Sequence, residues 1–297
     1  MIEIIFLGTS CMQPTKERNH NGILLKYNDE YILMDCGEGI QRQMRFAGIK
    51  PAKITKLLIS HWHGDHVLGI PGLMSAMGAD QYAKKLDIYG PKGSKEYFNH
   101  MFKSFDAKSI IKYDVTEVEK GDFFENEDFV LEAQPLKHTS KCIGFSFKEK
   151  DKRKIIVSKM KQFGLKEGPE IGKLQRGENI IFNSKKICPD EITKIISGKK
   201  ISYVSDTVIC DGANKLAKNA DVLISEATHL TKLGSKTENF MHLTVKDAAL
   251  IATENEVNQL ILTHISPRYK GNLEIMEEAQ KYFGNVIVAE DFMKFKL

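Results

Sequence analysis

The 297-residue sequence lacks any apolar run long enough to cross a membrane. Its longest apolar stretches, such as Ile201–Val204 and Leu260–Leu262, have the length of strands, whereas a membrane-spanning helix needs about 20 residues. No basic stretch precedes the first apolar run at the N-terminus, so no signal peptide is expected. We therefore expect a protein that has no contact with a membrane.

Cysteine is scarce, and its spacing suggests neither disulfides nor metal binding. The five cysteines are an odd number, they are scattered, and none forms a Cys-x-x-Cys pair. This pattern argues against a disulfide framework and against a cysteine-based zinc site. It favours a reducing compartment, and we expect a cytoplasmic protein.

Net charge is small, but it is unevenly distributed. The chain carries +4 overall, whereas residues 148–186 hold twelve Lys/Arg and five Asp/Glu, a net charge of +7. The same segment contains four glycines and little strand signal. A stretch of this length without regular structure is usually functional or disordered, so we expect a flexible, basic arm that protrudes from the body. Its charge indicates a polyanionic partner.

Short β-branched segments alternate with helical patterns along the rest of the chain. This alternation predicts a layered α/β architecture, and we expect residues 1–297 to form one domain with the basic segment inserted. The helical patterns cover Ile40–Ala47, Pro71–Ala79, Lys95–Phe102, Val245–Glu254 and Leu273–Tyr282.

Four potential metal ligands follow one expected strand directly. His61, His63, Asp65 and His66 come within six residues after the strand Lys56–Ser60. Imidazoles two residues apart can converge on one ion from a turn, while Asp65 and His66 point toward a second ion. So many polar groups at one strand end have no use in a hydrophobic core, and they predict a metal site.

The remaining ligands are expected at other strand ends. His138, Asp206 and His264 each lie just past a strand, where open α/β sheets place their sites. A hydrolytic zinc site needs about three protein ligands and one open position per ion, so these residues complete a two-ion set. The same nitrogen and oxygen ligands also accept manganese, iron or cobalt, so the metal stays open.

The pattern His-x-His-x-Asp-His with a later His, Asp and His resembles the metallo-β-lactamase superfamily over the whole chain. The resemblance implies a four-layer αβ/βα sandwich that binds two Zn²⁺ ions. In the superfamily pattern Asp206 bridges the two ions. The other implied ligands are His61, His63 and His138 for one ion, and Asp65, His66 and His264 for the other.

Five further motifs resemble one family of this superfamily, ribonuclease Z in its short form. Pro14–Asn19 is similar to the family's PxKxRN loop, and Asp35–Gln43 to its strand-to-helix turn. Glu226–His229 and His242–Thr244 resemble its HEAT and HST loops. Gly164–Gly177 lies where the family has its exosite arm. The order of these motifs makes the resemblance specific.

The resemblance implies a zinc-dependent endoribonuclease that removes the 3′ trailer from precursor tRNA. The expected products are a tRNA 3′-hydroxyl and a 5′-phosphorylated trailer, and the enzyme is expected to be a homodimer. Asp65 would act as general base, and His242, poised by Glu226, as general acid. The implied substrate-binding residues are Lys16, Arg18, Gly168, Pro169, Lys173 and Arg176.

Some alternatives stay open at this point. The same two-metal site could serve a phosphodiesterase or another hydrolase acting on small molecules, for which the basic segment would have no use. Asp35 is expected either to orient a ligand histidine or to cap its strand. For His229, a contact with a metal-ligand residue or with the substrate is less favoured than a role without either contact.

Overall fold

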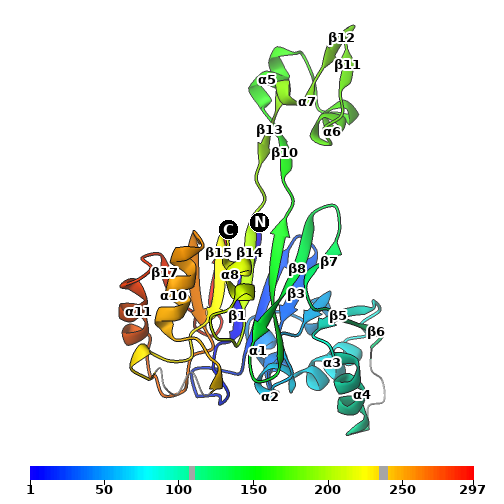
Figure 1. The fold of residues 1–297 in the computed structure, drawn as a ribbon. Helices are drawn as coiled ribbons and strands as arrows, with labels where there is room; N and C mark the ends of the chain where they lie inside the picture. Colours follow the sequence, from blue (N-terminus) through cyan, green and yellow to red (C-terminus); the bar gives the residue numbers. More distant parts are fainter. Residues whose placement is uncertain (107–110, 234–239) are drawn as a thin grey trace.

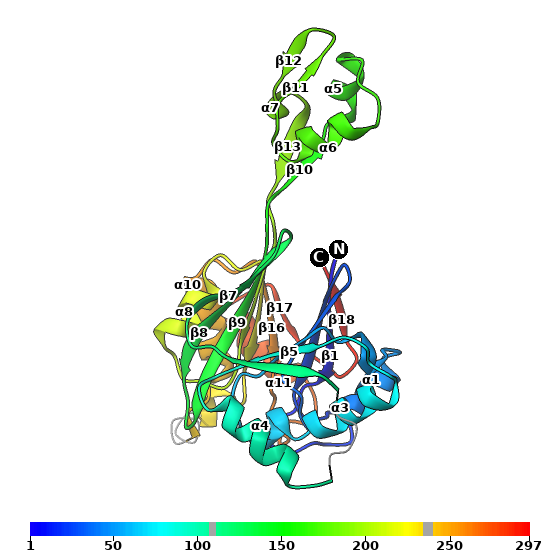
Figure 2. The ribbon, with the colours of Figure 1, turned by 90° about the vertical axis from the view of Figure 1, so that its right-hand side faces the viewer.

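The computed structural model describes residues 1–106, 111–233 and 240–297. Two seven-stranded mixed sheets lie face to face and form the body of the protein (Figure 1 and Figure 2). No helix in the described part of the chain has the length and apolar character needed to cross a membrane.

The first sheet holds the N-terminal half of the body and the last strand. Its strands, in spatial order, are β18 (Lys294–Lys296), β1 (Ile2–Gly8), β2 (Gly22–Tyr27), β3 (Glu30–Met34), β4 (Lys56–Leu58), β5 (Leu86–Gly90) and β6 (Tyr113–Glu117). The second sheet follows the order β17 (Val286–Val288), β16 (Gln259–Thr263), β15 (Val222–Glu226), β14 (Lys200–Val204), β9 (Lys141–Glu149), β8 (Phe129–Lys137) and β7 (Gly121–Glu125).

Helices cover the outer faces of both sheets. The first sheet is covered by α1 (Ile40–Phe46), α3 (Ile70–Ala79) and α4 (Ser94–Lys103), and the second by α8 (Asp211–Ala217), α10 (Val245–Glu254) and α11 (Leu273–Gln280). Short turns are η1 (Pro51–Lys53), α2 (Gly64–Val67) and η2 (Thr231–Leu233). One apolar cluster fills the space between the sheets, and two more lie beneath the helices. The expected four-layer sandwich is confirmed.

The helix start predicted at Thr244 shows how local sequence produces these layers. The Thr244 side chain accepts the backbone N–H of Asp247 at 3.1 Å, and the Asp247 carboxylate accepts the N–H of Thr244 at 3.0 Å. This capping box satisfies donors that the first turn of a helix leaves free. Behind it, Val245, Ala248 and Ala252 turn toward the second sheet.

An arm, residues 152–196, projects from the body (Figure 2). Its stalk is the antiparallel pair β10 (Lys152–Ile155) and β13 (Thr193–Ile196). Its head contains α5 (Val157–Gln162), α6 (Pro169–Gln175), β11 (Ile180–Phe182), β12 (Lys185–Ile187) and α7 (Pro189–Ile192). Five buried apolar side chains give the head its own small core: Leu165, Leu174, Ile180, Ile187 and Ile192.

The arm differs from the expected segment 148–186 at both ends. Strand β9 continues within the sheet to Glu149, and the chain returns to the body only after β13, because the two stalk strands pair with each other. The arm also contains regular structure where little was expected. Its flexibility relative to the body stays a prediction.

The arm and the expected metal site lie at opposite ends of the strands. Strand β8 runs toward His138, and β9 runs back to the base of the arm. In Figure 1 the short helix α2, which carries Asp65 and His66, lies at the lower end of the body, while the arm rises from the upper end.

Candidate metal centre

The loop after β4 brings its ligand-type side chains inward. Strand β4 pairs in parallel with β3 and β5, so its carboxyl end lies in the interior of the first sheet. Helix α2 begins at Gly64 and turns His66 back into the protein. Both His61 and His66 are fully buried. Fully buried imidazoles need polar partners. In both rings the Nδ1 atom has a supporting partner, Ser60 for His61 and Asp35 for His66, and the Nε2 atom lies near other ligand-type residues.

One group of ligand atoms comes from three loops. The Nε2 atom of His61 lies 3.1 Å from Nδ1 of His63, which in turn lies 3.2 Å from Nε2 of His138. The Asp206 Oδ2 atom lies 3.7 Å from His61 Nε2 and 3.9 Å from His138 Nε2. All four ligand atoms lie within 4.8 Å of one another.

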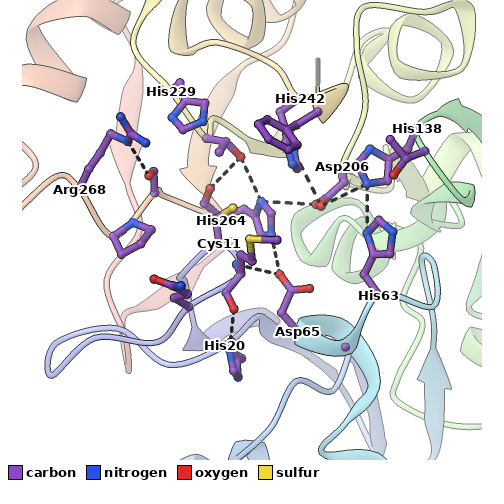
Figure 3. A pocket seen from close by; sticks show the side chains of 18 of the residues that line it. Cys11, His20, His63, Asp65, His138, Asp206, His229, His242, His264 and Arg268 are labelled. Atoms are coloured by element: carbon purple, nitrogen blue, oxygen red, sulfur yellow. Dashed lines mark hydrogen bonds and ion pairs between the residues drawn. The ribbon is translucent and has the colours of Figure 1, made fainter. Parts of the chain in front are cut away.

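A second group lies on the other side of Asp206. The Nε2 atoms of His66 and His264 are 3.3 Å apart, and Asp65 Oδ2 lies 3.6 Å and 3.4 Å from them. The Oδ1 atom of Asp206 lies 3.5 Å from His66 Nε2. The two oxygens of one carboxylate therefore face the two groups. Figure 3 shows the side chains of Asp65, Asp206 and His264 converging.

These contacts fit metal ions better than a set of hydrogen bonds. Donor atoms on a tetrahedral zinc, with bonds of 2.0–2.1 Å, lie about 3.3 Å apart, close to the separations within both groups. Asp206 Oδ1 is buried and has no hydrogen-bond partner among the described residues. A buried carboxylate oxygen without a partner is costly unless a cation occupies the space beside it. The donor set suits divalent cations.

The electrostatics of the two groups agree with this fit. Burial lowers the pKa of His61, His63 and His138, which keeps these rings neutral, as metal ligation requires. Burial alone would also lower the pKa of His66 and His264, but the Asp206 carboxylate raises both. Negative charge at the centre of the site therefore attracts positive charge.

Asp35 orients one of these histidines. Its φ of +57° follows the end of β3, and its side chain is fully buried. Oδ2 lies 2.8 Å from His66 Nδ1, and it accepts the hydroxyls of Ser60 and Tyr203, each at 2.8 Å. Oδ1 accepts the N–H of Ser60 at 2.7 Å. The carboxylate thus holds the His66 ring with Nε2 toward the second group. It accepts the backbone N–H just past the neighbouring strand β4, so the expected cap of its own strand is not seen.

Two further residues that support the proposed ligands were not singled out from the sequence. Tyr203 lies in the middle of the apolar strand β14, and Thr228 Oγ1 lies 3.2 Å from His264 Nδ1. Neither residue type is a usual zinc ligand. Thr228 stands inside the Glu226–His229 motif, which was the available signal for it, whereas Tyr203 stands in none of the motifs.

Glu226 and His242 are in contact beside the second group. Both carboxylate oxygens of Glu226 lie 3.1–3.2 Å from His242 Nδ1, and they also accept the Thr207 N–H and the Thr228 hydroxyl at 2.7 Å each. Burial would lower the pKa of His242, but the Glu226 carboxylate outweighs it and raises this pKa to about 9. His242 is therefore protonated at neutral pH.

The residues expected to bind substrate lie in different settings. Lys16 is exposed on the loop after β1. Gly168 and Pro169 begin α6 in the head of the arm. Lys173 is half-buried there and Arg176 is exposed, with carboxylate partners at 3.1 Å and 2.8 Å.

Arg18 corrects one expectation. It is only 9% exposed, and its guanidinium donates to the Thr9 hydroxyl, the Ala289 carbonyl and the Asn272 side chain. Because its hydrogen bonds turn inward, Arg18 holds the 9–20 loop against the C-terminal segment and does not face a substrate.

Comparison with known proteins decides the family. A curated ribonuclease Z from Methanothermobacter thermautotrophicus is 40% identical over 99% of this chain and 96% of its own length. One from Nocardia farcinica is 34% identical over 99% of this chain and 97% of its own. The chain belongs to the ribonuclease Z family. Among solved structures, human tRNase Z, short form, matches with a TM-score of 0.72 and 26% identity, covering 99% of this chain and 98% of that one.

A family model described as "Anti-Pycsar protein Apyc1" also matches, over residues 2–188. This part of the chain thus also belongs to the family of that model. The match includes the loop with His61–His66 but ends before Asp206 and His264, whereas the ribonuclease Z relatives match the whole chain. Membership of the ribonuclease Z family therefore accounts for the complete site.

Proposed function

We propose that this protein is a zinc-dependent endoribonuclease that removes the 3′ trailer of precursor tRNA. The proposed products are a tRNA with a 3′-hydroxyl and a trailer with a 5′-phosphate. The observation that carries the proposal is the arrangement of two ligand groups around the carboxylate of Asp206, with His242 beside them in one open pocket. We further propose two Zn²⁺ ions per chain, with manganese or another divalent ion as a substitute, and a cytoplasmic location.

The proposed ligands divide as the two groups do. His61, His63 and His138 would hold one ion, Asp65, His66 and His264 the other, and Asp206 both. When bound, two such ions lower the pKa of a water molecule and neutralise charge on phosphoryl oxygens.

Asp65 is placed to take a proton from the attacking water. Its Oδ2 atom accepts the backbone N–H of Met12 at 2.8 Å, which fixes the carboxylate at the edge of the pocket. Burial would raise its pKa, but His264 and His66 lower it, so the group is an ionised base. We therefore assign the role of general base to Asp65.

His242 is placed to protonate the leaving oxygen. Its Nδ1 is engaged by Glu226, which leaves Nε2 as the atom that can donate to a ligand. A protonated imidazole held in this way is a suitable general acid for an alkoxide leaving group. In the proposed reaction that group is the 3′ oxygen of the tRNA, and Glu226 keeps His242 charged and oriented.

The arm is the proposed contact for the body of the tRNA. RNA helices are bound mainly through phosphates and shape, which lysine and arginine side chains read without base contacts. Lys173 of α6 is half-buried in the head, Arg176 just after that helix is exposed, and Gly168 and Pro169 shape the start of the helix. Lys16 would act nearer the tRNA 3′ end.

The position of the arm favours a homodimer. The nine residues of β9 span roughly 30 Å, and β10 adds about 13 Å, so the head lies far from the site of its own chain. The body lies between them (Figure 1). A second copy with its arm directed to this site would allow one tRNA to contact both, and we propose such a pair.

Removal of the arm tests the substrate class. The Glu149 N–H donates to the Lys199 carbonyl at 2.9 Å, so residues 151–197 can be replaced by a short turn without disturbing the sheet. We expect loss of precursor-tRNA cleavage with unchanged turnover of a chromogenic phosphodiester. Unchanged turnover of both substrates would instead favour a phosphodiesterase that acts on small molecules.

A mixing experiment tests the homodimer. Neither the arm-deleted chain nor an Asp65→Ala chain should cleave precursor tRNA alone. If the arm acts on the partner's site, co-expressed mixtures of the two should recover activity, because one mixed pair combines an intact arm with an intact site. No recovery in mixed pairs isolated by two affinity tags would contradict the proposed arrangement.

A further inference from the structure

The pocket extends beyond the metal ligands to a second wall. Its volume is about 710 Å³, which is large enough for more than a phosphate group. In Figure 3, His229 and Arg268 lie on the side opposite His63 and His138, with His242 between the two sides. Phe240 also lines the pocket. We call His229 and Arg268, together with Phe240 from the segment that carries His242, the second wall.

The second wall is joined directly to the segment that carries the proposed acid. Phe240 precedes His242 by two residues. The His229 carbonyl accepts the N–H of Val245 at 2.8 Å, and His229 forms an isolated bridge with Thr244. The positions of Phe240 and His229 are therefore tied to that of His242.

The chemistry of cleavage decides which part of the substrate meets this wall. This step rests on the proposed function. In the hydrolysis, water adds to phosphorus, the bond from phosphorus to the 3′ oxygen breaks, and that oxygen takes a proton from His242. The nucleoside that carries the 3′ oxygen must then lie against His242, and hence beside the second wall. It is the last nucleoside of the tRNA, on the 5′ side of the cut.

The side chains of the wall are free to bind it. Phe240 is 59% exposed, so its ring is open to a ligand in the pocket. Arg268 is exposed, and no carboxylate among the described residues pairs with its guanidinium; its Nε donates to the Ser266 hydroxyl at 3.2 Å. His229 is 8% exposed, and its Nδ1 has no hydrogen-bond partner in the described parts of the chain.

These three groups match the parts of a ribonucleotide. Bases of single-stranded RNA stack on aromatic rings, guanidinium groups pair with phosphates, and the 2′-hydroxyl both donates and accepts hydrogen bonds. We propose that the second wall binds the nucleotide on the 5′ side of the cut, with the base on Phe240, its phosphate at Arg268 and its 2′-hydroxyl at His229. Binding there holds the 3′ oxygen against His242.

The state of His229 supports this assignment. Burial, and then the charge of Arg268, lower the pKa of His229 to about 4. The ring is therefore neutral at neutral pH and offers both one donor and one acceptor nitrogen. A neutral ring suits a hydroxyl group, which also both donates and accepts.

A comparison of two substrates tests the stacking contact. Phe240→Ala should lower kcat/KM about 10-fold on a precursor tRNA with an intact base on the 5′ side of the cut, within the range for one stacked base. On the same RNA made abasic at that nucleotide, the variant and the wild type should differ by less than about twofold, because the contact is already absent. Phe46→Ala, an equally exposed aromatic residue on α1 outside the pocket, is the matched control and should change neither value.

The remaining two contacts are tested in the same way. His229→Ala should lower kcat/KM on the normal substrate, and it should lose its effect on a substrate with a 2′-deoxy nucleotide at that position. Arg268→Met should raise KM more than it lowers kcat, while Arg45→Met, outside the pocket, should change neither. Melting temperatures and metal content check that each variant is folded.

Three results would overturn the assignment. The loss of kcat/KM in Phe240→Ala could be equal on the normal substrate and on the substrate that is abasic on the 5′ side of the cut. Alternatively, the loss could disappear only when the first trailer nucleotide is made abasic. Either result removes the site from the 5′ side of the cut while precursor-tRNA cleavage by the wild type still supports the proposed function. If the metal-loaded wild type cleaves no precursor tRNA, the proposed function and this inference fail together.

Discussion

The Asp35 carboxylate offers a sharp test, because one buried group holds a proposed ligand in place. We expect Asp35→Asn to weaken metal binding at the group formed by Asp65, His66 and His264. In the native site both carboxylate oxygens accept hydrogen bonds, from the Ser60 N–H on one side and from four side-chain partners, His66 among them, on the other. The side-chain NH₂ group of an asparagine would replace one of these two accepting oxygens. At that position a hydrogen-bond donor would then face other donors.

The expected size of the loss in metal affinity follows from these contacts. Loss of a hydrogen-bonded carboxylate behind a ligand histidine typically weakens metal affinity 10–100-fold, or about 1.4–2.7 kcal/mol. Misplaced donors in a fully buried site would also lower the free energy of unfolding of the metal-free protein by about 1–3 kcal/mol. The two effects are separable, because the first concerns affinity and the second stability.

The assay is competition for zinc between the protein and a chromogenic chelator, with urea denaturation of the metal-free protein beside it. Asp87→Asn is the matched control, because Asp87 is a partly exposed carboxylate on β5 that pairs only weakly, with Lys85 at 3.6 Å. We expect the control to bind zinc as the wild type does. If Asp35→Asn binds both ions with unchanged affinity, the orienting role assigned to Asp35 is refuted.

Three further predictions follow from single contacts. Cleavage needs protonated His242, so kcat of the wild type should fall only above about pH 9. Glu226→Gln removes the charge that raises the pKa of His242. In this variant the alkaline limb of the kcat–pH profile should shift to lower pH by more than about one pH unit. A Cβ on Gly198 would lie 1.9 Å from the Glu149 carbonyl oxygen at the base of the arm, so Gly198→Ala should raise KM for precursor tRNA, measured beside an unchanged turnover of a small phosphodiester. Arg18→Met should cost about 2–4 kcal/mol of stability in urea denaturation, since three inward hydrogen bonds are lost; a changed KM without a change in stability would restore its expected role in substrate binding.

Patterns with strong periodicity predicted the interior of the fold well. The helix expected at Val245–Glu254 has these bounds in the structure, and the strand before His264 ends at Thr263. In both cases buried apolar residues recur at the spacing of the element, and a capping or ligand residue marks its end. Local sequence and tertiary packing agree there, so local reasoning is sufficient.

In the described part of the chain, three of the four edge strands of the two seven-stranded sheets could not be predicted in this way. Strands β6, β7 and β18 lie at sheet edges and are rich in charged residues. Most of their side chains are exposed or half-buried. Charged edge strands protect a sheet from pairing with other chains, and their sequences look like loops. Their pairing depends on a neighbouring strand, which no local pattern reveals.

The candidate site shows the same division. Ligand-type residues at strand ends could be named from the sequence, because their chemistry is unusual in those places. Asp35 could also be named as a residue that orients a ligand histidine, but its partner Tyr203 could not, since Tyr203 reaches Asp35 across 168 residues and from the opposite sheet. Arg18 shows the converse error: a basic residue in a family motif was expected to face the substrate, and its hydrogen bonds lie inside the protein.

The most direct test of the account is to map the cut made by the zinc-loaded protein on a precursor tRNA with a 3′ extension. Both product ends are identified by end-labelling and mass spectrometry. Water as the attacking group predicts a tRNA with a free 3′-hydroxyl and a trailer with a 5′-phosphate, and no cleavage after chelation of the metal. A tRNA end that carries a 2′,3′-cyclic phosphate, or cleavage that persists without metal, would contradict the two-metal mechanism.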